Sequence, residues 1–175
     1  MLALRLGMIA NMAESISIIR FLGIRLGIYL ASVGVAYVLA TMTASQSVIA
    51  RLGGMGVDVS FADRVSMTLH DLAGMAGMFL PIVAFALLLA FLVTALLCRW
   101  LGAWRWVLYP LAGGVALICI HVALNLAFQI TPIAVARSPL GLLVQGLSGA
   151  AGGYTYVALL QRFRRRKTDV SKVGV

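Results

Sequence analysis

The sequence predicts an all-α membrane protein: a four-transmembrane-helix bundle with an N-terminal interfacial amphipathic helix and a short external helix before the second span. Of the 175 residues 62% are hydrophobic and 11% are charged, and the mean hydropathy is +1.04. These values lie outside the range of soluble domains. The apolar residues also gather in four runs, about 21–43, 72–98, 109–130 and 140–161, each long enough to cross a bilayer.

The basic residues indicate orientation rather than nucleic-acid binding, although the net charge is +9. Three of the 14 Lys and Arg, namely Arg51, Arg64 and Arg137, fall on predicted outer segments, and the rest flank the opposite ends of the spans. Because basic residues stay on the cytoplasmic side, we expect both termini in the cytoplasm. With no glycosylation acceptor and no organellar address, a bacterial inner membrane is expected and no nucleic-acid partner.

Residues 1–20 predict a helix that lies on the cytoplasmic surface of the membrane. Apolar side chains gather on one side of this helix and polar ones on the other. The apolar set is Leu2, Leu6, Ile9, Met12, Ile16 and Ile19, and the polar set is Asn11, Glu14 and Ser15. The first span, 21–43, then carries Gly23, Gly27 and Ala31 at four-residue intervals, a small-residue groove for another helix.

The loop 44–71 is the only sizeable outer region, and three glycines, Gly53, Gly54 and Gly56, divide it. Ser60 and Asp63 have the spacing of a capping box, which predicts a short helix leading into the second span. Phe61, Val65, Leu69 and Leu72 share one face of it. His70 and Asp71 fall where it meets the membrane, and we interpret them as a solvated polar collar.

The second span, 72–98, contains an expected hinge at Gly77 and Pro81. Pro81 has no N–H to donate to the carbonyl of Gly77, and its ring crowds that turn, so a kink is predicted there. A helix interrupted by Gly and Pro beside polar side chains is typical of transporter binding sites. The basic, aromatic turn that follows, around Trp100, Trp104 and Trp106, has the composition of an interfacial belt.

The third span, 109–130, carries strong polar groups deep in apolar sequence: His121, Asn125 and Gln129, at four-residue intervals on one helical face. Such groups are costly in hydrocarbon, so they are expected to face the bundle interior. The fourth span presents Gln145 and Ser148 among glycines that allow close helix approach. We call His121, Asn125, Gln129, Gln145 and Ser148 the polar seam, the candidate ligand-binding site.

The basic tail, 162–175, is expected to bind anionic headgroups through Arg162, Arg164, Arg165, Arg166 and Lys167. Grooves on the first and fourth spans exceed what one bundle core needs. They predict a homo-oligomer or docking to other membrane subunits. No metal site is predicted, because Cys98 and Cys119 lack the spacing of a metal or disulfide pair, and no cofactor is assigned.

Three functions remain open from the sequence. The polar seam suits a non-enzymatic transport-like, channel-like or ligand-binding unit, or an accessory subunit in which the seam holds helices together. His121 is the only titratable group near mid-membrane that switches near neutral pH. Haem or quinone binding through His121 is one alternative, and a bis-histidine haem would then need His121 from two subunits.

A second alternative is enzymatic. Gly146-Leu147-Ser148-Gly149 resembles the GxSG motif of rhomboid intramembrane proteases, and His121-x-x-x-Asn125 is similar to that family's histidine and asparagine pair. The resemblance implies Ser148 as nucleophile. It covers roughly ten residues, no histidine follows Ser148, and a base would have to be His70 or His121 within about 3 Å of the serine.

Overall fold

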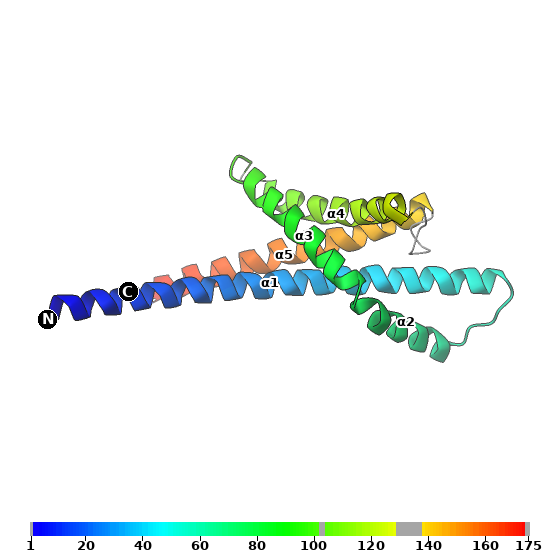
Figure 1. Cartoon of the computed structure of the whole chain (residues 1–175), viewed down its shortest axis with the longest axis horizontal. Coiled ribbons are helices and arrows are strands. Elements are labelled where there is room, and N and C mark those ends of the chain that lie inside the picture. The colour runs from blue at the N-terminus through cyan, green and yellow to red at the C-terminus, as the bar shows by residue number, and fades with distance from the viewer. Residues whose placement is uncertain (1, 102–103, 129–137, 174–175) are drawn as a thin grey trace.

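The computed structural model describes residues 2–101, 104–128 and 138–173, and the side chains of 19–101, 104–127 and 138–165. The described residues form helices joined by loops and turns and contain no strand, which confirms the all-α class. In chain order they are α1 (Leu2–Gly54), α2 (Phe61–Ala76), α3 (Phe79–Leu97), α4 (Arg105–Phe128) and α5 (Pro139–Val173). Helices α1 and α5 lie side by side and antiparallel, with both chain ends at the same end of the molecule (Figure 1).

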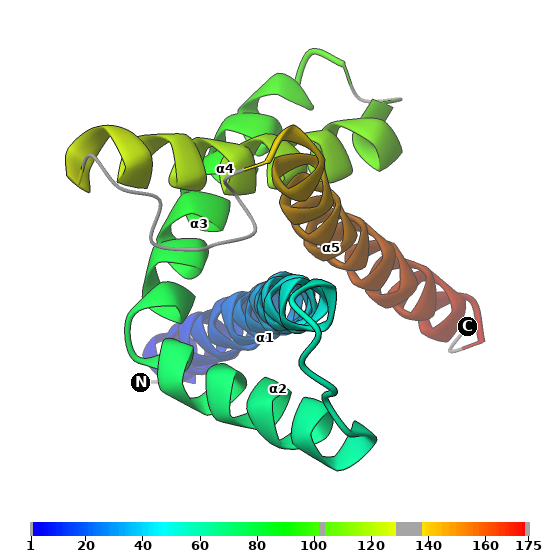
Figure 2. The same ribbon diagram turned by 90° about the vertical axis from the view of Figure 1, so that its right-hand side faces the viewer.

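The packing order places α1 next to α2, α3 and α5, while α4 covers α3 and α5. Figure 2 shows this arrangement from the end, with α2 and α3 on one side of α1 and α5 on the other. Neighbouring long helices alternate in direction along the chain (Figure 1). The bundle core therefore lies where α1, α3, α4 and α5 meet, and its apolar members include Val83, Leu87 and Leu117.

Helix α1 runs without interruption from Leu2 to Gly54, which differs from the expected division at residue 20. No proline and no adjacent pair of glycines stands between the predicted interfacial segment and the first span, so nothing ends the helix there. It also continues past the expected end at residue 43. Residues 44–54, assigned to a loop from sequence, are thus the last turns of α1.

Glycine ends α1. Gly56 has φ +80°, a left-handed conformation that favours glycine. The N–H of Val57 donates to the carbonyl of Leu52 (3.1 Å) and that of Gly56 to Gly53 (3.1 Å). This pair of bonds is a Schellman motif, which satisfies the last carbonyls of the helix.

Helix α2 begins at the predicted capping box. The Ser60 hydroxyl accepts from the N–H of Asp63 (3.2 Å) and donates to the Asp63 carboxylate (2.6 Å). The apolar side chains Phe61, Val65 and Leu69 are exposed, whereas Leu72 packs against the core. Only the end of α2 next to α3 is therefore held by apolar packing within this chain.

Helices α2 and α3 are separated at Gly77 and Met78, so the interruption includes Gly77 of the predicted hinge and ends before Pro81. Pro81 lies in the first turn of α3, where its missing N–H removes no bond that the helix needs. Phe79, Val83, Leu87 and Phe91 then form the buried row of α3 at four-residue spacing.

Glycine contacts bring α4 and α5 together. A Cβ on Gly149 would lie 2.2 Å from the carbonyl oxygen of Gly113, and one on Gly153 would lie 2.1 Å from that of Tyr109. On another side of α5, a Cβ on Gly152 would lie 2.9 Å from the carbonyl oxygen of Ser32 in α1. Gly149 and Gly153 are therefore packed against α4, and Gly152 is packed against α1.

Three helical segments in the described chain are long and apolar enough to cross a membrane: Ile19–Gly54, Phe79–Leu97 and Arg105–Ala127. Helix α3 also exposes large apolar side chains, among them Phe85 (64%) and Leu92 (60%). Such surfaces are stable against lipid rather than water. These properties indicate a membrane protein. Helix α5 is not among the three, because its glycines and polar residues lower its hydropathy.

Candidate functional site

His121 of α4 faces the bundle interior. Its side chain is 4% exposed, and its ring lies against Phe79, the first residue of α3, with ring centroids 6.0 Å apart. Phe79 in turn contacts the ring of Tyr37 on α1 (6.2 Å). The break between α2 and α3 thus places an aromatic ring directly against the imidazole. The Nε2 atom of His121 is buried and has no hydrogen-bond partner.

Gln145 of α5 is completely buried, at 0% exposure. Its Nε2 donates to the carbonyl of Ala40 (2.9 Å) and to Oγ1 of Thr43 (3.3 Å), which ties α5 to α1. Its Oε1 is buried and makes no hydrogen bond, although the side chain lies beside His121. The Gln145 amide and the His121 imidazole are therefore buried beside each other, close enough to interact but without a hydrogen bond of ordinary geometry.

A polar row on α1 continues the site towards α2. Thr41 and Ser45, one helical turn apart, are 0% and 2% exposed. The Ser45 hydroxyl donates to Oδ2 of Asp71 on α2 (2.6 Å), while Oγ1 of Thr41 is buried without a partner. Asp71, interpreted from sequence as part of a solvated collar, thus packs on α1 at the edge of this row.

Ser148 is buried, at 4% exposure, but its hydroxyl donates to the carbonyl of Val144 one turn earlier in α5 (3.1 Å). Among the described residues, neither His121 nor His70 accepts a hydrogen bond from it, and His70 is exposed. The arrangement that the rhomboid resemblance requires, a serine bonded to a histidine base, is not formed in this structure.

Asn125 is exposed and does not join His121 in the interior. The side-chain direction advances by about 40° for each four-residue step along an α-helix, so a stripe at this spacing gradually leaves one interface. Gln129 lies outside the described residues. The structure therefore brings together His121, Gln145 and Ser148, and it leaves Asn125 on the surface.

Sequence reasoning missed the contributions of α1 and α2: Thr41, Thr43, Ser45 and Asp71. One signal was present, because Tyr37, Thr41 and Ser45 follow each other at four-residue intervals in an apolar span. The Tyr37 hydroxyl donates to the carbonyl of Leu72 (2.5 Å), so this stripe faces α2 and α3.

Two hollows lie away from the seam. An apolar groove of about 750 Å³ runs between α3 and α4, and its lining includes Phe85, Leu89, Leu111 and Cys119. A smaller pocket of about 200 Å³ lies between the start of α4 and the last part of α5. The described part of the chain holds no group of three or more metal-ligating side chains.

Comparisons with protein-family models, with curated proteins and with solved structures find no match for this chain. The class of protein therefore follows from the fold and the buried polar groups alone. It is an all-α membrane protein with hydrogen-bonding side chains in its core.

Proposed function

We propose that this chain binds a small hydrogen-bonding solute or ion within the membrane, in a transport-like or channel-like role. The observation that carries the proposal is the buried pair of Nε2 of His121 and Oε1 of Gln145, which lie beside each other without a hydrogen bond of ordinary geometry. An unpaired buried polar atom costs about 1–3 kcal/mol. A site that keeps a nitrogen and an oxygen unpaired side by side is suited to a ligand or water that bonds to both.

Thr41 and Ser45 on α1, with Asp71 on α2, provide polar groups between the edge of the bundle and the polar seam. Asp71 is partly exposed on α2, and Thr41 lies next along α1 to Ala40, whose carbonyl binds Gln145. A polar solute therefore has hydrogen-bonding groups at the edge of the bundle and in its interior. Phe79 covers one face of His121, so movement at the Gly77 and Met78 break would uncover the imidazole.

We further propose α5 as a fourth span, with both termini in the cytoplasm of a bacterial inner membrane. Support comes from the antiparallel packing of α5 on α4 and α1, and from basic residues that follow its apolar part. Arg162, Arg164 and Arg165 are exposed there, while the side chains of Arg166 and Lys167 lie outside the described set.

Self-association is proposed through Gly23 and Gly27, which have open space beside them. Native mass spectrometry would show a monomer if this is wrong.

Neither alternative from the sequence gains support from the geometry. A haem at His121 would have to displace Phe79, whose ring packs against the imidazole, and Ser148 bonds to its own helix. A purely structural seam remains the opposing hypothesis, and it makes a different prediction for substitutions of His121.

The test uses purified full-length protein in liposomes, with glycerol, urea and protons as probes. Stopped-flow light scattering follows the two solutes, and an entrapped pH dye follows protons. We expect the protein to raise the rate for at least one probe. Gln145→Leu and His121→Leu should lower that rate by about tenfold, since each removes a hydrogen bond of about 1.4 kcal/mol to the passing ligand.

Ser148→Ala is the matched control, because that hydroxyl is satisfied within α5. It should leave the rate unchanged. His121→Leu should also keep the thermal stability in detergent, since it removes a buried atom without a partner. Rates equal to those of empty liposomes for all probes, together with a large loss of stability in His121→Leu, would instead assign the seam a structural role.

A further inference from the structure

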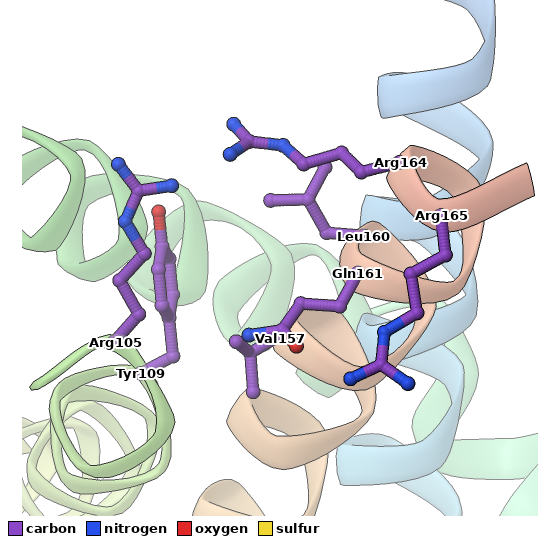
Figure 3. A pocket seen from close by; sticks show the side chains of 7 residues that line it. All are labelled: Arg105, Tyr109, Val157, Leu160, Gln161, Arg164 and Arg165. Atoms are coloured by element: carbon purple, nitrogen blue, oxygen red, sulfur yellow. The ribbon is translucent and has the colours of Figure 1, made fainter. Parts of the chain in front are cut away.

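The pocket between α4 and α5 is lined by an unusual set of side chains. Two arginines and a glutamine come from α5, and an arginine and a tyrosine come from the first turns of α4: Arg164, Arg165, Gln161, Arg105 and Tyr109. Figure 3 shows Arg164 extending from α5 towards Arg105 and the Tyr109 hydroxyl across the hollow. None of the lining residues is acidic.

Arg105 and Arg164 extend towards the same side of this hollow of about 200 Å³ (Figure 3), and like charges brought close together favour an anion beside them. Val157 and Leu160 form an apolar part of the wall, which reduces screening by water. Guanidinium groups bind phosphate oxygens with paired, charge-assisted hydrogen bonds, and a tyrosine hydroxyl adds a neutral donor. The chemistry of the pocket therefore matches a phosphate group.

The surroundings of the pocket place it at the level of lipid headgroups. Trp104 immediately precedes Arg105 and is 60% exposed, Trp100 is 87% exposed, and Trp106 is 42% exposed. The Trp106 ring contacts Tyr154 on α5, with centroids 5.7 Å apart. Exposed tryptophan and tyrosine mark the membrane interface. Basic pockets between helices at that level bind the headgroups of anionic lipids.

We propose that this pocket binds the phosphate group of an anionic phospholipid. The site differs from diffuse attraction of the basic tail to the membrane, because two of its groups, Arg105 and Tyr109, belong to α4. Bound lipid would bridge the start of α4 to α5. The proposal does not depend on the polar seam or its function.

The experiment titrates full-length protein in a nonionic detergent with short-chain phosphatidic acid and measures bound lipid by native mass spectrometry. Phosphatidylcholine with the same acyl chains and inorganic phosphate are the comparison probes. We expect phosphatidic acid to bind more tightly than either. Arg105→Gln should weaken its binding by about tenfold, the loss of one charge-assisted contact.

The matched control is Arg162→Gln. It also removes one positive charge, from α5 next to the pocket residue Gln161, but Arg162 does not line the pocket. It should change the affinity by less than about twofold, as expected for an exposed charge. Tyr109→Phe is a second test that keeps the ring contacts with Phe91 and Tyr156 and removes only the hydroxyl. It should weaken binding by about threefold, even if Arg105→Gln fails to fold.

Three results would overturn the proposal. Equal losses in Arg105→Gln and Arg162→Gln would mean diffuse surface attraction. Equal binding of phosphatidylcholine and phosphatidic acid would mean that the acyl chains are recognised. Inorganic phosphate binding as tightly as phosphatidic acid would assign the pocket to free phosphate instead of lipid.

Discussion

Two backbone carbonyl groups of α4 leave no room for side chains at two positions of α5. The carbonyl oxygens of Gly113 and Tyr109 lie where side chains on Gly149 and Gly153 would begin, at 2.2 Å and 2.1 Å. A carbonyl in a helix cannot move without breaking its own hydrogen bond. The close approach of α4 and α5 is thus fixed by the absence of side chains, and it places Gln145 and His121 within the same interior.

Gly153→Ala should destabilise the protein by about 1–3 kcal/mol, because its methyl group meets backbone rather than a flexible side chain. The control is Gly34→Ala on α1, where an added Cβ would meet nothing within 4 Å. That change should be neutral or stabilise by up to about 1 kcal/mol through helix propensity. Thermal unfolding in detergent measures both, and equal midpoints would contradict the α4–α5 packing.

The interior position of His121, Gln145 and Ser148 was predictable from sequence, because polar side chains in hydrocarbon are costly. The exposed position of Asn125 was not predictable, because a stripe with four-residue spacing turns gradually around the helix. Only part of that stripe on α4 faces the other helices. The hydrogen-bond partners of Gln145 were not predictable from the sequence pattern either, because Ala40 and Thr43 lie 105 and 102 residues away along the chain. Only the tertiary packing of α1 on α5 selects them.

Among the helices, the best predicted boundary is the start of α2, where Ser60 and Asp63 form local bonds that depend on sequence alone. The glycines after α1 were recognised as a break for the same reason. The length of α1 was not predicted, because hydropathy shows which residues are apolar enough to lie in lipid. It does not show where the helix ends. The interruption before α3 was predicted at Gly77 and Pro81 and occurs at Gly77 and Met78.

Ser60→Ala should loosen the first turn of α2. The change removes the acceptor for the N–H of Asp63, which costs about 1 kcal/mol. Amide hydrogen exchange in residues 62–65 should then be about fivefold faster, while the core of α3 is unaffected. Ser66→Ala, an exposed change within α2, serves as control and should not raise the exchange rate. Unchanged exchange in Ser60→Ala would mean that contacts other than the cap hold this turn.

Across the whole molecule, the directions of the long helices determine where each connection lies. Helices α1, α3, α4 and α5 alternate in direction (Figure 1), so α1 and α4 run towards one end of the molecule and α3 and α5 run back towards the other. The basic residues Arg99, Arg105 and Arg162 to Arg165 gather at the latter end. This distribution of charge supports the proposal that the latter end lies in the cytoplasm.

This topology depends on α5, the helix whose hydropathy is too low to identify it as a span, and position 171 decides the question. In a protein with Cys98 and Cys119 replaced by Ser, single cysteines are placed by Asp58→Cys, Leu101→Cys and Ser171→Cys. An impermeant thiol reagent on intact cells should label position 58 and leave 101 and 171 unlabelled until the membrane is opened. If α5 does not cross, three crossings leave position 171 on the outer side, and it will be labelled together with position 58.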